Sequence, residues 1–375
     1  MIKLNKIEVC HVVSGLKTGG VESMIYNYCS HMDFDKYNFH ILYQHEPSKK
    51  NVDEFEKIGF KLHRISSKVK HPFKNYFETK KYLKNNNINV VHCHMTLMNF
   101  IPLFAAKRLN IKRRICHSHN SDVRKKYIFI KMIEKILKLF CIHYATDLVA
   151  CGVDAGVYMY GENNKYEVIN NALDLNKYMF SNEKRKQIRK KFNISDDTFV
   201  IGHVGRFTEQ KNHDFLINVF QSILLRNKKV ALFLLGNGEL YENIKEKCNE
   251  LKINKYVNFI GVVDNVCDYY SAFDIFVLPS IWEGLPVVSI EAQASGIKCF
   301  FSNKIDKNAV IYNKNSKLIE LDEKEWARNL EEAIKKSNKY DRTIDMQLLC
   351  NSGYDINTEM KKLKKMYIGG SDEEY

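Results

Sequence analysis

Residues 279–292 read Pro-Ser-Ile-Trp-Glu-Gly-Leu-Pro-Val-Val-Ser-Ile-Glu-Ala. They follow a short apolar run, and Pro286 then favours the start of a helix. A strand, a glycine-containing turn and a helix N-terminus together make an anion site, because free backbone N–H groups and the helix dipole point at the ligand. Glu283 and Glu291 can accept hydrogen bonds from hydroxyl groups. The stretch therefore suits a ligand with phosphate and polyol parts, such as a nucleotide sugar; alternatively, Glu291 only complements the helix dipole.

Short apolar runs alternate with longer amphipathic stretches along the whole chain. We expect strands at residues 7–13, 39–43, 61–65, 89–92, 114–117, 147–151, 166–169, 199–204, 230–235, 257–260, 275–278, 298–301 and 318–321. Helical stretches, such as residues 20–32 and 96–109, lie between them. This alternation predicts an α/β fold with two doubly wound, Rossmann-like domains, each a parallel sheet covered by helices on both faces.

A polar, charged segment, residues 180–197, separates the two halves. We expect residues 1–178 to form an N-terminal domain and residues 179–352 a C-terminal domain that binds the nucleotide sugar. Residues 353–375 should form a helix that returns to the first domain, followed by a polar tail. Ligands of doubly wound sheets bind at the carboxyl ends of the strands, so we expect the chemistry in a cleft that the two domains face.

Composition narrows the possible partners. The chain has 375 residues, 45% of them hydrophobic, and a net charge of +14. The charge suits nucleic acid, an anionic membrane surface or a polyanionic substrate, but no nucleic-acid-binding motif is present, and we expect no nucleic-acid partner. No apolar run reaches membrane-spanning length, and the N-terminus lacks a signal-peptide pattern. We therefore expect a cytoplasmic protein.

Ten cysteines are scattered without a Cys-x-x-Cys pair and predict buried, reduced thiols. Most of them fall in strand-like runs: Cys10, Cys93, Cys116, Cys151 and Cys299. The segments His92-Cys93-His94 and Cys116-His117-Ser118-His119 look like metal clusters. Neither has zinc-finger spacing, and neighbouring strand residues point to opposite faces of a sheet. We predict no metal site.

The end of the strand expected at residues 199–204 offers a pyrophosphate clamp. Gly205 and Arg206 follow the strand, and Lys211 precedes a helix that Asn212 can cap. Arginine supplies a planar fork of donors and lysine a point charge. The alternative is an ordinary solvated turn in a basic protein.

Gly236-Asn237-Gly238 follows another expected strand. The pattern suggests a dinucleotide-binding turn, but the third glycine is missing, because position 241 is tyrosine, and no acidic residue is placed for the ribose. We therefore do not predict a nicotinamide cofactor, although a close approach of this backbone to a nucleotide remains open.

Two features of the first half could face the cleft. Gly19 and Gly20 join the first strand to the first helix, and paired glycines let a ligand approach the backbone; a simple tight turn is the alternative. His119 follows the strand at residues 114–117 and could hold a hydroxyl or stabilise developing charge. A lone histidine is more often a satisfied surface or core residue.

Taken together, these motifs resemble the retaining glycosyltransferases of family 4, which have the GT-B fold, and especially their bacterial capsule and exopolysaccharide branch. The resemblance is strongest over residues 202–301, where the motifs occur in the family's order and spacing. In the first half, Asn120 stands where the family more often has aspartate.

The resemblance implies a role for each site residue. Arg206 and Lys211 would hold the donor diphosphate and stabilise the leaving group, Glu291 would bind the ribose, and Glu283 the donor sugar. His119, near the transferred sugar, completes the catalytic set with Glu283, Arg206 and Lys211. The remaining donor-binding residues would be Gly19, Gly20, Gly205, Gly236, Gly284, Leu285, Pro286 and Val287.

The resemblance also implies the substrates. A sugar, hexosyl or N-acetylhexosaminyl, would move from a nucleotide donor, with a UDP-sugar favoured, to a glycan acceptor on a lipid carrier. No metal or other cofactor is expected, since two cations and a helix N-terminus can stabilise the leaving diphosphate. Rival functions are a sugar-nucleotide epimerase, a phosphorylase, or a non-catalytic protein that binds polyanions or membranes.

Residues 121–142 predict a basic amphipathic helix. Apolar residues recur at helical spacing, and lysines are interleaved with them. Such a helix can lie on an anionic membrane as a peripheral contact, which fits a lipid-linked acceptor. The alternative is that its apolar face packs on the protein's own sheet.

Overall fold

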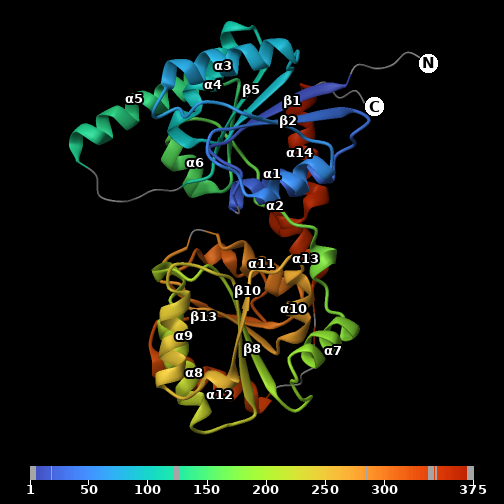
Figure 1. Ribbon diagram of the computed structural model, residues 1–375, viewed down its shortest axis with the longest axis vertical. Coiled ribbons are helices and arrows are strands. Elements are labelled where there is room, and N and C mark those ends of the chain that lie inside the picture. Colours follow the sequence, from blue (N-terminus) through green and yellow to red (C-terminus); the bar gives the residue numbers. More distant parts are fainter. Residues whose placement is uncertain are drawn as a thin grey trace. The chain divides into compact units, whose positions relative to one another are not determined.

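The computed structural model describes residues 6–17, 19–120, 127–283, 285–336, 342 and 344–369. The chain forms two compact units (Figure 1). The first combines Met1–Leu173 with Asp355–Tyr375, and the second is Asp174–Tyr354. The sequence placed the boundaries at residues 178 and 352. No helix among the described residues is both long and apolar enough to cross a membrane.

The first unit is built on a seven-stranded parallel sheet with the order β3-β2-β1-β4-β5-β6-β7. Its strands are β1 (Ile7–Val12), β2 (Tyr37–Tyr43), β3 (Lys61–Arg64), β4 (Val90–Cys93), β5 (Arg113–Ser118), β6 (Asp147–Ala150) and β7 (Glu167–Val168). Its helices are α1 (Gly20–Ser30), α2 (Lys49–Lys57), α3 (Pro72–Asn85), η1 (Thr96–Asn99), α4 (Phe100–Arg108), α5 (Ile128–Tyr144), α6 (Val153–Tyr160) and α14 (Ile356–Ile368).

Alternation along the strands separates two cores, one on each face of this sheet. Val9, Val90 and Ile115 face the core that α1 and α14 cover. Cys10 and Cys93 face the opposite core. The terminal helix α14 thus packs on the first unit (Figure 1).

The second unit holds a six-stranded parallel sheet with the order β10-β9-β8-β11-β12-β13. Its strands are β8 (Phe199–Val204), β9 (Val230–Leu235), β10 (Val257–Gly261), β11 (Ile275–Leu278), β12 (Lys298–Ser302) and β13 (Ser316–Ile319). The helices are η2 (Leu175–Tyr178), α7 (Asn182–Lys191), η3 (Glu209–Lys211), α8 (His213–Leu224), α9 (Tyr241–Glu250), η4 (Asn254–Tyr256), α10 (Val266–Ala272), α11 (Val287–Ala294), η5 (Lys307–Ala309), α12 (Glu323–Lys336), α13 (Met346–Leu349) and η6 (Cys350–Tyr354).

The predicted fold class is confirmed, because both sheets are entirely parallel and doubly wound. In each sheet the strand order reverses beside the first strand of the unit. The reversal lies between β1 and β4 in the first unit and between β8 and β11 in the second. Loops leave such a point in opposite directions, so a ligand can reach the strand ends there.

A buried ion-pair network attaches α7 to the second sheet. Asp274, just before β11, accepts from Arg185 at 2.6 Å and from Arg189 at 3.2 Å, and it also accepts from the Val200 backbone N–H at 2.7 Å. Both arginines and the carboxylate are buried. Removing one member of such a network leaves buried charge without compensation, which costs far more than an exposed pair contributes.

We therefore expect Asp274→Ala to lower the free energy of unfolding by about 3–5 kcal/mol, because two buried guanidinium groups lose their counter-ion. Urea unfolding followed by circular dichroism measures the change. Asp197→Ala is the matched control, since Asp197 pairs with Lys229 on the surface. Equal losses of stability in the two variants would contradict the role of the buried network.

Candidate active site

Glycines allow three strand ends of the second unit to lie close together. The Gly205 N–H donates to Leu235 O at 3.0 Å, and the Gly236 N–H donates to Gly261 O at 2.8 Å. Gly236 has a φ of +128°, and a Cβ there would lie 2.1 Å from Gly205 O. A Cβ on Gly238 would meet Phe207 O at 2.4 Å. The chain's packing on itself thus requires the glycines of this turn.

The loops after β8 and β11 are joined at the point where the strand order reverses. The Ile281 N–H donates to Gln210 O at 2.9 Å, and Gln210 Nε2 donates to Trp282 O at 2.9 Å. Between these loops, Lys211 forms an ion pair with Glu283, and Ser280 Oγ donates to Glu283 at 3.1 Å. The structure therefore brings together two residues that the sequence placed in one site, from positions 72 apart in the chain.

Asn212 does not cap the following helix through its side chain, as the sequence had suggested. It adopts the left-handed conformation, with a φ of +57°, and makes no side-chain cap bond. Its Nδ2 donates instead to Pro279 O at 3.2 Å, so the amide ties the two loops together. The capping prediction is wrong because an N-cap residue has an extended backbone and accepts through its side chain, whereas the backbone of Asn212 is left-handed.

Glu291 is held by two tyrosines. Tyr270 donates to Oε2 at 2.7 Å and Tyr178 donates to Oε1 at 3.2 Å. Burial raises the pKa of the Glu291 carboxyl, while the two tyrosine bonds and Lys211 oppose that rise. The carboxylate sits on α11 with a fixed orientation and keeps lone pairs for further donors. The sequence did not single out either tyrosine, because only the fold brings them to α11.

The other predicted residues of this unit lie around the same edge. Arg206 is exposed at the end of β8, Pro286 is the buried residue before α11, and Leu285 and Val287 are half-buried beside it. Gly284 lies outside the described residues.

The predicted glycines of the first unit begin α1. Gly19 is the N-cap residue, and nothing lies within 4 Å of where a Cβ would stand on Gly20. A cavity of about 150 Å³ opens beside Gly19 and is lined by Glu22 and Lys50, among others. Burial raises the pKa of Glu22. The open space at Gly20 leaves its backbone accessible to a ligand.

Lys68 is a buried cation that the sequence gave no reason to select. Its Nζ donates to Ser14 Oγ at 2.5 Å and lies 3.5 Å from Met95 Sδ. No carboxylate among the described residues pairs with it, and burial lowers its pKa to about 8. It adds positive charge at the carboxyl edge of the first sheet.

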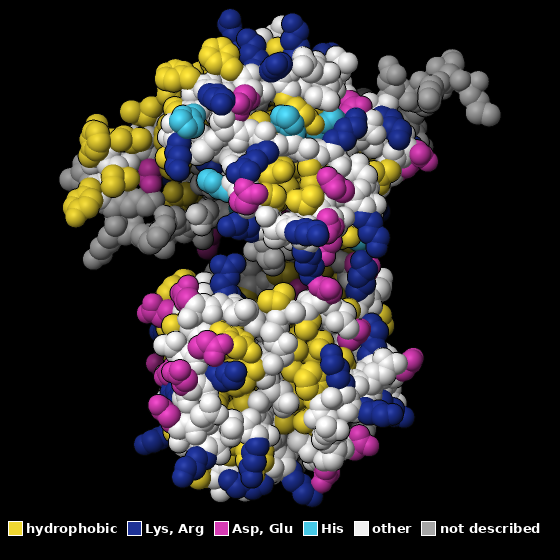
Figure 2. All heavy atoms as spheres, in the orientation of Figure 1, with side chains coloured by type: hydrophobic (Ala, Val, Ile, Leu, Met, Phe, Trp, Pro, Cys, Tyr) yellow, Lys and Arg dark blue, Asp and Glu magenta, His cyan; other side chains and the backbone are white. Residues whose placement is uncertain are grey.

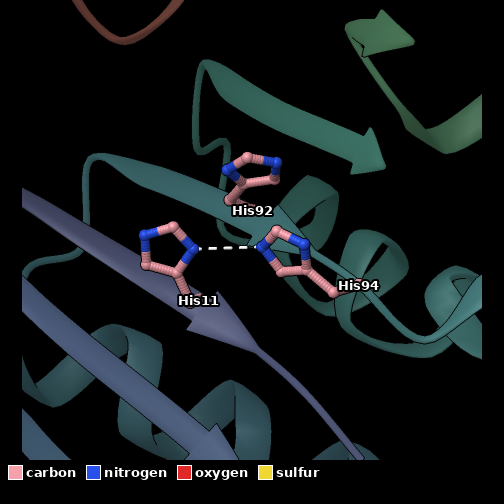
Figure 3. A group of neighbouring side chains, drawn as sticks. All are labelled: His11, His92 and His94. Atoms are coloured by element: carbon pink, nitrogen blue, oxygen red, sulfur yellow. Dashed lines mark hydrogen bonds between the residues drawn. The ribbon is translucent and has the colours of Figure 1, made fainter. Parts of the chain in front are cut away.

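Five imidazole rings form a layer at the carboxyl edge of the first sheet, and we call these residues the histidine layer: His11, His92, His94, His117 and His119. Figure 3 shows three of its members: His11 from β1, His92 from β4 and His94 just after β4. Strand alternation does not separate these rings, as we had expected it to do. Residues two apart, such as His92 and His94, share one face of a strand.

Ring nitrogens in this layer are close enough together to hold a metal ion. The sets His11, His92, His94 and His94, His117, His119 each have candidate ligand atoms within 4.8 Å of one another. Burial lowers the pKa of every ring, to about 3 for His11 and about 4 for His119, which favours the neutral imidazole at neutral pH. The absence of a metal stays a prediction.

Stability should fall as the pH is lowered. The folded protein keeps these rings neutral, whereas an unfolded histidine takes up a proton near pH 6.5. Below pH 6.5 the unfolded chain therefore binds more protons. The free energy of unfolding should drop by up to about 1.4 kcal/mol per pH unit for each such ring. The loss continues to about pH 4 for His119 and about pH 3 for His11.

Urea unfolding at pH 7.5, 6.0 and 5.0 measures this dependence. His11→Gln should give a shallower slope, because one buried neutral ring is removed. The exposed His143 offers a matched control, and His143→Gln should leave the slope unchanged. A slope that is the same in the His11 variant as in the parent would contradict the prediction.

Each half of the chain matches a family of glycosyltransferases. Residues 184–346 match the family described as Glycosyl transferases group 1, and residues 18–177 match Glycosyltransferase Family 4. The chain is 28% identical to the putative glycosyltransferase EpsF of Bacillus subtilis, over 98% of both chains. It is 28% identical to the capsular polysaccharide biosynthesis glycosyltransferase CapH of Staphylococcus aureus, over 96% of this chain and 99% of that one.

Two further comparisons concern the substrates of other proteins. An Escherichia coli UDP-Gal:alpha-D-GlcNAc-diphosphoundecaprenol alpha-1,3-galactosyltransferase is 26% identical over 79% of both chains. The crystal structure of Anabaena HepE in complex with UDP and glucose superposes with a TM-score of 0.77 at 14% identity, covering 97% of this chain and 100% of that one. At this identity the superposition demonstrates a shared fold.

Two doubly wound parallel sheets, with the motifs at their strand ends, define a glycosyltransferase of the GT-B fold. More particularly, the predicted resemblance to glycosyltransferase family 4 and its bacterial capsule branch is confirmed, because the two family models match the two halves of the chain and the relatives EpsF and CapH match it over almost its whole length.

Proposed function

We propose that this glycosyltransferase moves a hexosyl or N-acetylhexosaminyl group from a UDP-sugar to a lipid-linked glycan, with retention of configuration and without a metal ion. The Lys211–Glu283 pair carries the proposal, because it sets a cation and a carboxylate side by side where the strand order reverses. The UDP bound to HepE and the diphosphoundecaprenol acceptor of the Escherichia coli relative support this choice of substrates. CapH supports a role in capsular or exopolysaccharide synthesis.

The donor would replace the internal ion pair with its own charges. Lys211 would turn from Glu283 to the diphosphate, where exposed Arg206 adds a second cation. Glu283, released from Lys211, would accept from the sugar hydroxyls, with the backbone of residues 284–287 beside it. Two cations and the N-terminus of α11 would then stabilise the leaving group without a metal.

The rest of the donor would be held by fixed groups. Glu291, oriented by its two tyrosines, would accept from the ribose hydroxyls. We propose that Gly205 and Gly236 allow the backbone to approach the nucleotide. From the first unit, Gly19 and Gly20 would approach the diphosphate, and His119 the transferred sugar.

In the proposed reaction, one bond at the anomeric carbon breaks and one bond forms. The bond from that carbon to the diphosphate oxygen breaks, and the electron pair stays on the UDP. The acceptor oxygen forms its bond on the same face of the sugar, which retains the configuration. The proton of the acceptor hydroxyl passes to the departing diphosphate oxygen.

We expect a UDP-sugar to raise the melting temperature, and GDP-, ADP- and CMP-sugars to have little effect. Arg206→Ala and Lys211→Ala should abolish the shift, because each removes a cation from the diphosphate, and transfer should fall by about 100-fold or more. To test Glu291 we choose glutamine and not alanine as the replacement, because the glutamine carbonyl can still accept a hydrogen bond from the tyrosines. Thermal shift and product analysis, with and without EDTA, provide the measurements.

Lys229→Ala is the matched control, because Lys229 pairs with Asp197 on the surface. An undiminished shift in Arg206→Ala and Lys211→Ala would contradict the proposed donor site. UDP-sugar turnover without any acceptor would indicate an epimerase, and a need for inorganic phosphate a phosphorylase. Polyanion binding without affinity for sugar nucleotides would indicate the non-catalytic alternative.

The helix α5 leaves its apolar residues exposed, so the alternative that they pack on the sheet is wrong for most of them. Hydrophobic side chains gather on the surface over this helix in Figure 2. Tyr127, before the helix, is 83% exposed and Phe129 71%. The other exposed apolar residues of α5 are Ile130, Met132, Ile133, Ile136, Leu139 and Phe140. Residues 121–126, the start of the predicted helix, lie outside the described residues.

We propose that α5 rests on an anionic membrane, which would bring the enzyme to a lipid-linked acceptor. Its apolar side chains would enter the interface while Lys131 and Lys135, both exposed, contact the headgroups. Exposed Phe73 and Phe77 of α3 would extend the apolar surface.

Sedimentation with anionic vesicles tests this contact. Phe129→Ser combined with Ile133→Ser should release the protein, because the interface loses its apolar anchors, and Lys131→Glu with Lys135→Glu should weaken binding most at low salt. Leu225→Ser, at an equally exposed apolar residue of the second unit, should bind like the parent. Unchanged partitioning of both double variants would refute the proposal.

A further inference from the structure

A line of hydrogen bonds runs through the histidine layer to His119. Cys29 Sγ lies 3.5 Å from His11 Nε2, His11 Nδ1 lies 3.1 Å from His94 Nε2, and His94 Nδ1 lies 2.8 Å from His119 Nε2. Figure 3 shows the middle link, between His11 and His94. The line connects α1 to the end of β5 across the sheet.

The two ends of this line differ in their exposure to solvent. Cys29, His11 and His94 are buried, at 0%, 1% and 6% exposure. His119 is half-buried, and its Nδ1 has no hydrogen-bond partner among the described residues. His11 and His94 use both ring nitrogens in this line, and His119 uses only Nε2, so the state of the line is expressed at His119 Nδ1.

Proton counting permits only two arrangements of the line. A neutral imidazole carries one N–H and one lone pair, so it donates at one nitrogen and accepts at the other. If His11 donates from Nδ1, His94 must accept at Nε2 and donate from Nδ1, and His119 must accept at Nε2. If the direction reverses, every ring carries its proton on Nε2 and His119 Nδ1 becomes a free lone pair.

The thiol selects between these two directions. Burial keeps Cys29 protonated, because it raises the pKa well above the usual value. A thiol has a proton to donate but is a poor acceptor. Cys29 therefore donates to His11 Nε2, and each following ring carries its proton on Nδ1.

We propose that Cys29, His11 and His94 are positioning residues that fix His119 as the neutral tautomer with its proton on Nδ1. His119 then offers the ligand a hydrogen-bond donor and not a base. This inference rests on the proposed function only in assigning that ligand to the donor sugar or its leaving diphosphate. A donor suits an oxygen that gains negative charge, and it would leave the acceptor's proton to the departing diphosphate.

Nitrogen NMR of protein labelled with ¹⁵N-histidine tests the tautomer directly, without any activity. Two-bond ¹⁵N–¹H correlations distinguish Nδ1–H, Nε2–H and the charged ring, and His119→Asn assigns the His119 signal. We expect the Nδ1–H form for His11, His94 and His119 at pH 7. An Nε2–H or charged His119 would overturn the proposal.

Two substitutions of Cys29, at the buried end of the line, distinguish a positioning role of this residue from a packing role. Cys29→Ser keeps a donor and should preserve the Nδ1–H form, whereas Cys29→Ala removes the donor and should admit the Nε2–H form of His119. An unchanged tautomer in Cys29→Ala would overturn the role of the thiol. In Cys29→Ala, kcat should fall while KM for the donor stays near the parent value, since contacts to the rest of the donor remain.

Substitution of His119 itself separates a donor from a base. Asparagine places an N–H near the position of Nδ1, whereas aspartate of similar shape offers only acceptors. We expect His119→Asn to retain at least about tenfold more transfer activity than His119→Asp. Greater activity of the aspartate variant would identify a base and overturn the proposal.

Metal analysis of the purified protein tests whether a metal ion occupies the histidine layer. His117 Nε2 is buried without a hydrogen-bond partner among the described residues, so it is the ring nitrogen with which a metal would first be expected to bond. Stoichiometric zinc would replace the N–H bonds of the line and overturn the proposal. If the protein shows the Nδ1–H tautomers but transfers no sugar, this inference stands and the proposed function is rejected. If it transfers sugar with an Nε2–H His119, the proposed function stands and this inference is rejected.

Discussion

The pairing of parallel strands around β8 and β11 is the constraint on which the donor side of this enzyme depends. At this reversal of strand order the loops diverge, and the glycines let neighbouring strand ends approach until Gly236 touches the Gly205 carbonyl. In the loop after β8, Gln210 bonds the loop after β11 through both its carbonyl and its side chain, and Lys211 beside it pairs with Glu283. The buried Asp274 network holds the start of β11 against α7. The same strand leads into the loop that carries Glu283.

The carboxyl edges of the two sheets carry different groups. In the second unit, the half-buried Lys211 and Glu283 form an ion pair. In the first, the carboxyl edge of the sheet holds neutral imidazoles and a lysine with a lowered pKa. Neutral rings avoid the cost of burying charge, yet their hydrogen bonds permit few proton arrangements. The fold thereby fixes the state of His119 from groups that never touch a ligand.

The exposed apolar surface of α5 adds a second kind of interaction to the same unit. Water-exposed phenylalanine and isoleucine side chains at this density mark an interaction surface. Basic residues are interleaved with them, which suits an anionic lipid surface and fits an acceptor carried on a lipid. Substrate recognition would then combine a polar edge for the donor and an apolar surface for the acceptor's carrier.

The sequence by itself determined the architecture, because strand alternation and motif order are local patterns. It identified every strand that the structure describes, although β2 and β13 each begin two residues earlier than expected, at Tyr37 and Ser316. It also placed Lys211 and Glu283 in one site. Only the tertiary structure decided the partners: Tyr178 and Tyr270 on Glu291, Asn212 on Pro279, and the histidine layer, which the sequence argument had dismissed. These contacts join residues far apart in the chain, so neither periodicity nor spacing encodes them; the crossovers between parallel strands bring them together.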